Sequence, residues 1–553
     1  MTAGESNAPT GIRRVLNTNT LAAVLLLAAM AVSLVRVMGI QKSLFDPGKI
    51  TIRVAHWQLE LGYREALQRQ IDEYNRLHRK DHVEVVQMAV TERVYRQWLN
   101  VHLISGTAPD LSELGMAKFT SEGRFVMQFF TPVTEYVTKP NPYNAGTALE
   151  HTPWRDTFYD GMLGGYRDDL QDYFNPPLFF STTRLFYNKA LLRAATGTDQ
   201  PPRTLGALLD ACDKIRALGA RTGKQLVPIA GSKYSRDFFF SMLTVPFTEA
   251  YQSALDTDLD GEITSLETYA GFQRRAISFG DQRMRAYFEC FRAMCDQFSK
   301  GFMAMDRDQA AFLFVQGDAV MISSGSWDAN SLFRQAKFDV GVTHLPLPGP
   351  GERWHAYIAG PVNEATATGY GGLGLYKYSR HKEWAVDFLQ FITSREHNEK
   401  LNRDAGWLPV TVGATPSAEM TPFTPDPTGF SPLTGLSFKD CGRISTFIQG
   451  QLWVFLQGEI DYPTLQSNCE QAIANPGIGA DRVWAEQYDG AVATVRDQER
   501  YLAVHTTLML MDPSATNVPP KFRRALLQQA AANNGEHLRY LYQRQNHRPM
   551  PPL

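Results

Sequence analysis

The chain has 553 residues, and its 55 Lys and Arg against 57 Asp and Glu give a formal net charge of −2. Hydrophobic residues make up 44% of it, enough to build several cores, which excludes an intrinsically disordered protein. The near-neutral charge argues against nucleic-acid binding, because such proteins present a basic face to the phosphates. Five scattered cysteines exclude a disulfide scaffold and show no thiolate metal-binding spacing.

An apolar run near the N-terminus predicts export from the cytoplasm. Arg13 and Arg14 precede the almost unbroken apolar stretch 21–35, which is the pattern of a Sec-type export segment. Residues 20–40 are just long enough to cross about 30 Å of hydrocarbon. We therefore expect residues 1–45 to be a signal anchor that holds the protein in the inner (cytoplasmic) membrane, with a cleaved signal peptide as the alternative. Either way, the following chain lies in the periplasm or another extracytoplasmic space.

The next segments alternate between strand and helix patterns. Residues 49–57 are rich in alternating β-branched side chains, which predicts a strand, and residues 62–80 carry apolar side chains at helical spacing. A second strand near 83–85, a helix over 92–105 and a short strand at 110–114 follow. This order predicts a mostly parallel sheet covered by helices, a layout that binds ligands beyond the carboxyl ends of its strands. Trp57, Glu60 and Glu113 fall at those ends.

Proline-rich stretches predict where the chain passes between larger units. They lie at 140–153, 345–351 and 411–432. Several such passages suggest two lobes that exchange segments rather than separate domains in a row. Residues 437–545 have an almost entirely helical pattern.

Six sequence blocks, taken in order, resemble one protein family. They are GTAPDLSELG (106–115), PPLFFSTTRLFYNKALL (176–192), FVQGDAVMISSGSW (314–327), FDVGVTHLPLPG (338–349), GGLGLYKYSRHKEWAVDFLQFITS (371–394) and GWLPV (406–410). Together they resemble the extracellular solute-binding proteins of ABC importers, family 1, the maltose and oligosaccharide group. An N-terminal export segment is also what this family requires.

The resemblance implies an α/β fold of the two-lobe periplasmic-binding-protein type (type II), in which crossing hinge strands join the lobes and let them close over a ligand. Mapped by block order, lobe 1 would comprise 50–150 and 357–411, and lobe 2 would comprise 155–355 and 412–500. Additional C-terminal helices at about 505–545 depart from the family pattern.

The resemblance further implies a receptor, not an enzyme, that captures a carbohydrate and delivers it to ABC permease subunits. Sugars present apolar C–H faces ringed by hydroxyls, so their sites need aromatic platforms together with polar and carboxylate side chains. The expected ligand-binding residues are Trp57, Glu60, Glu113, Phe180, Ser181, Ser324, Trp327, Asp328, Trp354 and Trp407.

Residues 256–267 fit the twelve-residue EF-hand loop, which predicts a structural calcium site. Calcium takes six to eight oxygen ligands at about 2.3–2.6 Å, and spaced carboxylates supply them. The expected ligands are Asp256, Asp258, Asp260, Glu262 through its carbonyl oxygen, Thr264 through water, and Glu267. Gly261 would allow the sharp turn, and Ile263 would fix the loop to the core.

Other functions stay open at this point. The same fold could serve a non-transport sensor or an assembly protein, or it could bind a polyamine, a metal chelate or a peptide. A glycosidase would need only two carboxyls, such as Glu60 and Glu113, but the chain has no H-E-x-x-H, no G-x-S-x-G and no phosphate-binding loop.

Overall fold

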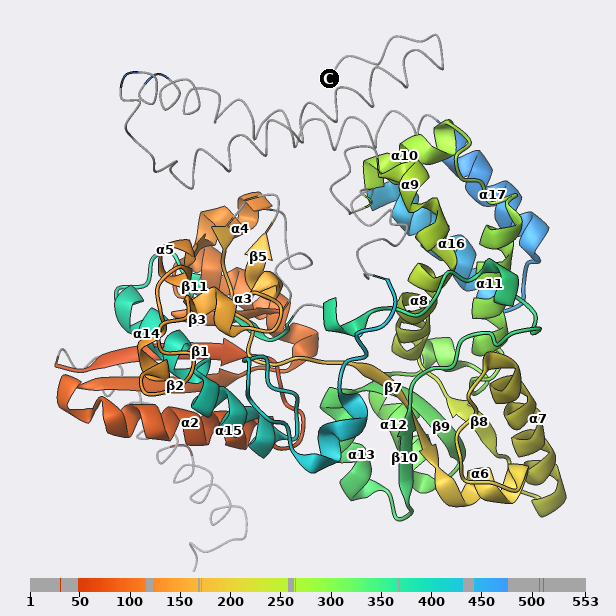
Figure 1. Ribbon diagram of the computed structural model, residues 1–553, viewed down its shortest axis with the longest axis horizontal. Helices are drawn as coiled ribbons and strands as arrows, with labels where there is room; N and C mark the ends of the chain where they lie inside the picture. Colours follow the sequence, from red (N-terminus) through yellow and green to blue (C-terminus); the bar gives the residue numbers. More distant parts are fainter. Residues whose placement is uncertain are drawn as a thin grey trace, which may run out of the picture.

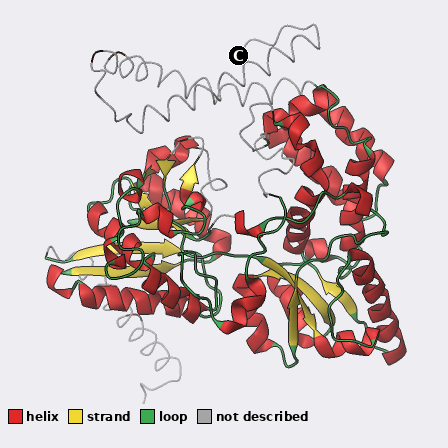
Figure 2. Ribbon diagram, viewed as in Figure 1, coloured by secondary structure: helices red, strands yellow, loops and turns green. Residues whose placement is uncertain are grey.

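The computed structural model describes residues 48–475, with gaps at 116–122, 168–169, 171, 257–262, 264, 367–368 and 431–441, together with the single residues Met30, Thr507 and Met511. These residues form two α/β lobes that lie side by side (Figures 1 and 2). Apart from those three single residues, the predicted anchor 1–45 and the C-terminal extension 505–545 lie outside the described part. Within that part, no helix has the length and apolar character needed to cross a bilayer.

Lobe 1 is built on a five-stranded sheet in the order β2-β1-β3-β11-β4. Its strands are β1 (Ile50–His56), β2 (Val83–Ala89), β3 (Leu111–Gly115), β4 (Phe130–Thr131) and β11 (Gly372–Tyr376). β1 runs parallel to both β2 and β3, whereas β11 is antiparallel to β3. The lobe's helices are α2 (Tyr63–Leu77), α3 (Glu92–Ser105), α4 (Gly123–Phe129), α5 (Thr134–Val137), α14 (Lys382–Ile392) and α15 (Arg395–Ala405).

The strands and helices predicted between residues 49 and 115 are confirmed. In α2, for example, Tyr63, Leu67, Ile71 and Tyr74 recur at helical spacing and are buried in the lobe 1 core. The helix begins after Gly62, whose φ of 99° is in the left-handed region that glycine favours. This start places the chain between β1 and α2 at the edge of the lobe, where functional side chains of open α/β sheets lie.

Lobe 2 contains a four-stranded sheet in the order β10-β7-β9-β8. The strands are β7 (Thr183–Asn188), β8 (Val227–Ala230), β9 (Ala319–Gly325) and β10 (Val340–Thr343). All seven residues of β9 are buried, because β7 and β8 flank it and helices cover the sheet. The helices are α6 (Lys189–Thr196), α7 (Leu205–Thr222), α8 (Lys233–Thr248), α9 (Gln252–Leu255), α10 (Ser265–Gln273), α11 (Gln282–Cys295), α12 (Arg307–Gln316), α13 (Ala329–Gln335), α16 (Gly442–Leu456) and α17 (Tyr462–Ala474).

A large helical part of lobe 2 extends beyond the sheet (Figure 1). There α8, α11, α16 and α17 share one apolar core with residues of β7 and β8. The helical pattern predicted for 437–545 is confirmed over the described residues 442–474, which contain α16 and α17. Cys212, Cys290, Cys295 and Cys469 are buried, and they fill space in the core as small apolar residues.

Three chain segments pass between the lobes and lie next to one another. Phe179 forms an isolated bridge with Tyr370, and Phe180 forms one with Leu408. The backbone N–H of Leu178 donates to the carbonyl oxygen of Tyr370 at 2.8 Å, and that of Phe180 donates to Leu408 at 2.8 Å. Hydrogen bonding between neighbouring crossings makes them a single hinge rather than three independent linkers.

The first two crossings differ from the predicted boundaries. Trp154, Phe158 and Met162 are buried in the lobe 1 core, so the first crossing lies near residue 180 and not near 155. Tyr357 packs against the lobe 2 core, so the second crossing lies near 370 and not at 357. Proline-rich sequence marks irregular backbone, but the core that receives the buried side chains decides to which lobe a segment belongs.

Candidate functional site

The two lobes meet where one central strand of each sheet ends. β1 ends at His56 and continues into Trp57, and β9 ends at Gly325 and continues into a single helical turn, Ser326–Asp328. The arrow of β1 points toward lobe 2 (Figure 2). Side chains that follow these strand ends therefore come together at the lobe boundary.

Glu113 holds the backbone that follows β1. One carboxylate oxygen, Oε2, accepts from the backbone N–H of Trp57 at 3.2 Å, and Oε1 accepts from the side-chain amide of Gln58. Glu113 is only 1% exposed, and this burial raises its pKa to about 8. Its present contacts position Trp57 and Gln58, and its burial separates it from solvent.

Trp57 packs on lobe 1 while part of its ring is still accessible. Its ring meets that of Tyr95 edge to face, with 5.0 Å between centroids. Tyr95 lies on α3 and is buried. The indole is therefore oriented by the helix behind it, as an aromatic binding platform requires.

An ion pair joins the two lobes. Arg307 Nη2 of α12 lies 3.1 Å from Glu60 Oε1 of lobe 1. Arg307 Nε lies 3.9 Å from Asp328 Oδ2, and this same oxygen accepts from the hydroxyl of Ser324. Burial raises the pKa of Glu60, and the neighbouring guanidinium opposes the shift. Arg307 thus lies between a carboxylate of each lobe.

Further contacts fasten the same boundary. Arg93 of α3 pairs with Asp306, the N-cap residue of α12, at 2.9 Å. The side-chain amide of Asn330 donates to the carbonyl oxygen of Leu61 at 3.1 Å. Beside it is a pocket of about 310 Å³, lined by Leu61, Gly62, Glu65, Arg69, Asn330, Arg334 and Asp404.

Trp327 and Trp407 meet at the boundary but are exposed to different degrees. Trp327 belongs to lobe 2 and packs, partly buried, against the lobe 1 core. Trp407 donates from its indole nitrogen to the carbonyl oxygen of Trp327 at 3.3 Å. It is 1% exposed and stacked on Tyr63 with 4.4 Å between centroids, so it is a core residue that supports Trp327.

The remaining predicted ligand residues lie elsewhere. Phe180 is buried in the lobe 2 core, and Ser181 is partly exposed on the first crossing. Trp354 is also buried in lobe 2, among the helical core residues, with its φ at 73° and the Arg353 guanidinium 4.5 Å from its ring centroid. Trp354 therefore differs from its predicted place in the cleft, because the loop after β10 folds toward the helices. The structure gathers Trp57, Glu60, Glu113, Ser324, Trp327 and Asp328.

Two further residues at this boundary, Gln58 and Arg307, were missed by sequence reasoning. Residues 306–309 contain a local signal, since Asp306 and Gln309 form a capping box that starts α12 and puts Arg307 in its first turn. Nothing local indicates that this turn faces lobe 1. Only the packing of the lobes brings Arg307 to Glu60.

The predicted calcium ligands Asp258, Asp260, Glu262 and Thr264 lie outside the described residues. The two described ligands, Asp256 and Glu267, are both buried. Ile263 is 5% exposed and belongs to the lobe 2 core, which confirms its predicted packing role. The described residues contain no group of three or more His, Cys, Asp or Glu arranged to hold a metal ion.

Comparison with known sequences identifies relatives of the chain. Residues 83–427, more than half of the chain, match the family described as bacterial extracellular solute-binding protein. The chain is 26% identical over 267 residues to the sn-glycerol-3-phosphate-binding periplasmic protein of Salmonella paratyphi A, and 24% identical over 267 residues to that of Yersinia enterocolitica. Each match covers 46% of this chain and 53% of the relative, so the chain spans about half the length of these curated relatives.

Solved structures share the two-lobe fold. A chitin oligosaccharide binding protein superposes with a TM-score of 0.51 at 16% identity, covering 76% of this chain and 98% of that one. The GacH receptor of Streptomyces glaucescens gives 0.52 at 16% identity, with 77% and 97% covered. A maltose-bound protein of T. maritima gives 0.51 at 16% identity, with 77% and 99% covered. At such low identity these likenesses establish the fold.

Proposed function

This chain belongs to the bacterial extracellular solute-binding proteins, and from that premise we propose that it captures a carbohydrate between its lobes and delivers it to the permease of an ABC importer. The observation that carries the proposal is the convergence of aromatic and carboxylate side chains from both lobes on one boundary. Trp57 and Glu60 come from lobe 1, and Trp327 and Asp328 come from lobe 2. Aromatic faces suit the C–H surfaces of sugars, and carboxylates accept from their hydroxyls.

Lobe closure supplies the mechanism of capture. The three crossings form a hydrogen-bonded hinge, and a solute that touches both lobes stabilises the closed arrangement over the open one. On closure, a hydroxyl group of the solute would donate to the Glu60 carboxylate while Arg307 stays paired with it. The permease would then recognise the closed form, and other subunits would hydrolyse ATP.

A second candidate solute comes from the names of the sequence relatives, which bind sn-glycerol 3-phosphate. Arg307, a guanidinium at this boundary, could hold a phosphate. A phosphorylated polyol and a neutral oligosaccharide therefore compete as ligand classes for the same group of side chains.

Isothermal titration calorimetry of the full chain tests the proposal. The panel contains malto-, xylo- and chito-oligosaccharides together with sn-glycerol 3-phosphate. We expect saturable binding of a neutral oligosaccharide, lost in Trp327→Ala and retained in Trp453→Ala, which removes a tryptophan that is 36% exposed on α16. Binding of no sugar by a folded protein would refute the carbohydrate assignment, and failure to co-purify with permease subunits would favour a sensor or assembly role.

We also propose that residues 20–40 anchor the protein in the membrane. The support is the apolar run behind two arginines and the extracellular character of the family. Membrane fractionation and N-terminal sequencing of the mature protein distinguish the anchor from a cleaved signal. Recovery of a soluble mature chain beginning after the apolar run would contradict it.

Calcium is proposed as a structural ion of lobe 2. The helices that flank the motif support the fit: α9 ends at Leu255, immediately before the first loop position, and α10 begins at Ser265, the tenth. In the EF-hand motif the second helix likewise carries the last, bidentate glutamate, here Glu267. When bound, the ion would neutralise the loop carboxylates and keep Ile263 packed in the core.

A further inference from the structure

Negatively charged side chains surround Arg307 at the lobe boundary. Arg307 is flanked by Glu60 at 3.1 Å and Asp328 at 3.9 Å, and the carboxylate of Glu92 also interacts electrostatically with it. Another guanidinium at the boundary, Arg93, is paired with Asp306 at 2.9 Å. Among the described residues around Arg307, carboxylates therefore outnumber guanidiniums.

Glu60 offers an unused acceptor oxygen at this boundary. Glu60 Oε2 is shielded from solvent and, within the described part of the chain, accepts no hydrogen bond, while Oε1 is occupied by Arg307. A buried carboxylate oxygen without a donor is costly, so it favours a ligand that brings an O–H. A phosphate brings further acceptors instead of the donor that Glu60 lacks.

Building on the carbohydrate function proposed above, we propose that Glu60 and Asp328 make this site selective by charge, so that it takes uncharged, hydroxyl-bearing solutes and excludes phosphate-bearing ones. A phosphate bound by Arg307 would lie next to the carboxylates of Glu60 and Asp328. Like charges brought together at a poorly solvated interface oppose binding strongly. A neutral polyol leaves Arg307 paired and donates to the vacant oxygen of Glu60. This selectivity would distinguish the chain from its sequence relatives, whose names state that they bind sn-glycerol 3-phosphate.

Removal of the Glu60 and Asp328 carboxylates tests this charge selectivity, called the charge filter below. The full chain and the double variant Glu60→Gln/Asp328→Asn are titrated with sn-glycerol 3-phosphate by calorimetry. We expect the wild type to show no saturable binding at millimolar ligand, and the association constant to rise by about tenfold or more in the variant, because the guanidinium loses both of its competitors.

A matched control separates local charge from net charge. Glu84→Gln/Asp213→Asn removes the same two charges from partly exposed and exposed positions on β2 and α7, where the side chains are 36% and 79% exposed. We expect this control to behave like the wild type toward sn-glycerol 3-phosphate. An equal gain in the control, or no gain in a folded Glu60→Gln/Asp328→Asn variant, would overturn the proposal.

The oligosaccharide panel distinguishes failure of the filter from failure of the carbohydrate function. A wild-type chain that binds a neutral oligosaccharide and also binds sn-glycerol 3-phosphate as tightly overturns the filter alone. If the wild type binds no sugar but the double variant gains phosphate binding, the charge filter is supported and the carbohydrate function is refuted. Thermal unfolding checks the fold. If the double variant fails to fold, the single variant Asp328→Asn is expected to show a smaller gain in the same direction, and no gain in it would overturn the filter.

Discussion

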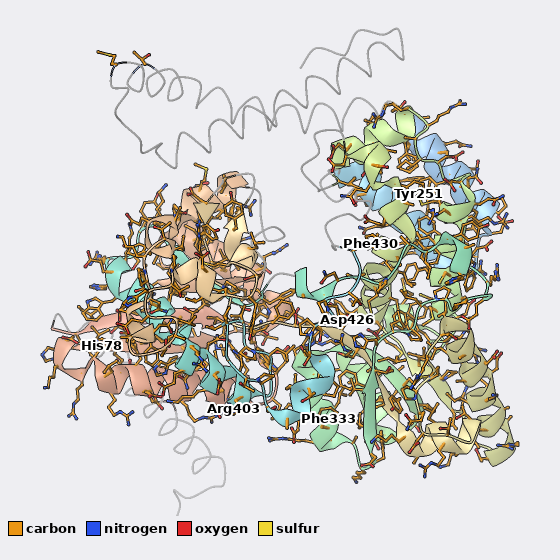
Figure 3. All side chains as sticks on the ribbon, in the orientation of Figure 1. His78, Tyr251, Phe333, Arg403, Asp426 and Phe430 are labelled. Atoms are coloured by element: carbon orange, nitrogen blue, oxygen red, sulfur yellow. The ribbon has the colours of Figure 1, made fainter. Side chains whose placement is uncertain are left out.

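Arg184 and Glu364 form a bidentate ion pair in lobe 2, with Nη1–Oε1 and Nη2–Oε2 distances of 2.6 and 2.9 Å. The Arg184 side chain is fully buried and also donates to the carbonyl oxygens of Pro422 and Thr424. Arg184 follows the first crossing, Glu364 precedes the second, and Pro422 follows the third. Asp426, whose backbone N–H donates to Glu364, lies on the side of lobe 2 toward lobe 1 (Figure 3). One guanidinium thus ties together the lobe 2 ends of the hinge.

Breaking this pair is expected to destabilise the protein. Glu364→Gln leaves the buried guanidinium without its counter-charge, and we expect the free energy of unfolding to fall by about 3 kcal/mol. Urea unfolding followed by circular dichroism measures the change. Arg193→Gln, which breaks the exposed Arg193–Asp199 pair, serves as the control and should cost at most about 1 kcal/mol. Equal losses in the two variants would contradict the role assigned to Arg184.

A glycine lies where the second crossing comes close to the first. Gly371 has a φ of 70°, and a Cβ atom there would lie 2.2 Å from the ring of Phe179 in the first crossing. Gly106 has a similar φ of 73°, but a Cβ there would meet no atom within 4 Å. Gly106→Ala should therefore cost about 1 kcal/mol from backbone strain alone. Gly371→Ala should cost about 1–3 kcal/mol more from overpacking.

Thermal unfolding compares the stability of these two glycine variants, and small-angle scattering reports whether the separation of the lobes changes. A shift in scattering limited to Gly371→Ala would link the clash to the hinge. If both variants lose the same stability and scatter identically, the close approach of the crossings does not control the hinge.

Glu113 predicts a pH dependence of stability. Its pKa is raised in the folded protein from the ordinary 4.5 to about 8, so between these values the folded state holds one proton more than the unfolded state. Its contribution is therefore fully present below about pH 4.5 and is lost as the pH rises through 8, with a slope of up to about 1.4 kcal/mol per pH unit. Urea unfolding from pH 5 to 9 should show a flatter profile for Glu113→Gln. Parallel profiles for variant and wild type would argue against this shift.

The tryptophans at the boundary should separate into two classes. Trp407 is fully buried, so Trp407→Ala should lower the free energy of unfolding by about 3–5 kcal/mol. Trp57→Ala removes a partly exposed ring and should cost less stability while weakening solute binding. Urea unfolding and calorimetric titration of both variants provide the two measurements. Loss of binding in a stable Trp407→Ala protein would instead make Trp407 a direct ligand contact.

Chelation of calcium should weaken lobe 2. An ion bound only by the folded state adds about 2.7 kcal/mol when its concentration is a hundred times the dissociation constant. We expect EGTA to lower the melting temperature, excess calcium to restore it, and Asp258→Asn/Asp260→Asn to abolish the difference. Asp213→Asn, a carboxylate removal on the exposed face of α7, should leave the calcium response intact. A melting temperature that does not change with EGTA would contradict the proposal that calcium stabilises lobe 2.

Local patterns predicted much of the fold because their causes are local. The apolar spacing in α2 and the alternation in β1 appear in the sequence, and the structure reproduces both elements within a few residues. The C-terminal limit of lobe 1's first segment was harder to predict. Trp154 and Phe158 are apolar side chains that either lobe could bury, and no local pattern states which core receives them.

Some residues of the candidate site could likewise be predicted from local patterns, whereas others could not. Trp57, Glu60 and Glu113 could be found because residues at the carboxyl ends of parallel strands meet at one edge of a sheet. Trp354 could not be excluded from sequence, since its burial depends on how the loop after β10 folds toward α11. Arg307 was missed because it follows an ordinary helix cap and is brought to Glu60 by a contact between residues 247 positions apart.

By itself, the amino-acid sequence determined the family resemblance, the alternating strands and helices, and five acidic and aromatic residues at the lobe boundary. These follow from periodicity and from residue order, which act over a few neighbouring positions. Only the tertiary structure decided where the chain crosses between lobes, which tryptophans are buried, and that Arg307 stands between Glu60 and Asp328. Those outcomes depend on which surfaces pack together, and packing is a property of the whole chain.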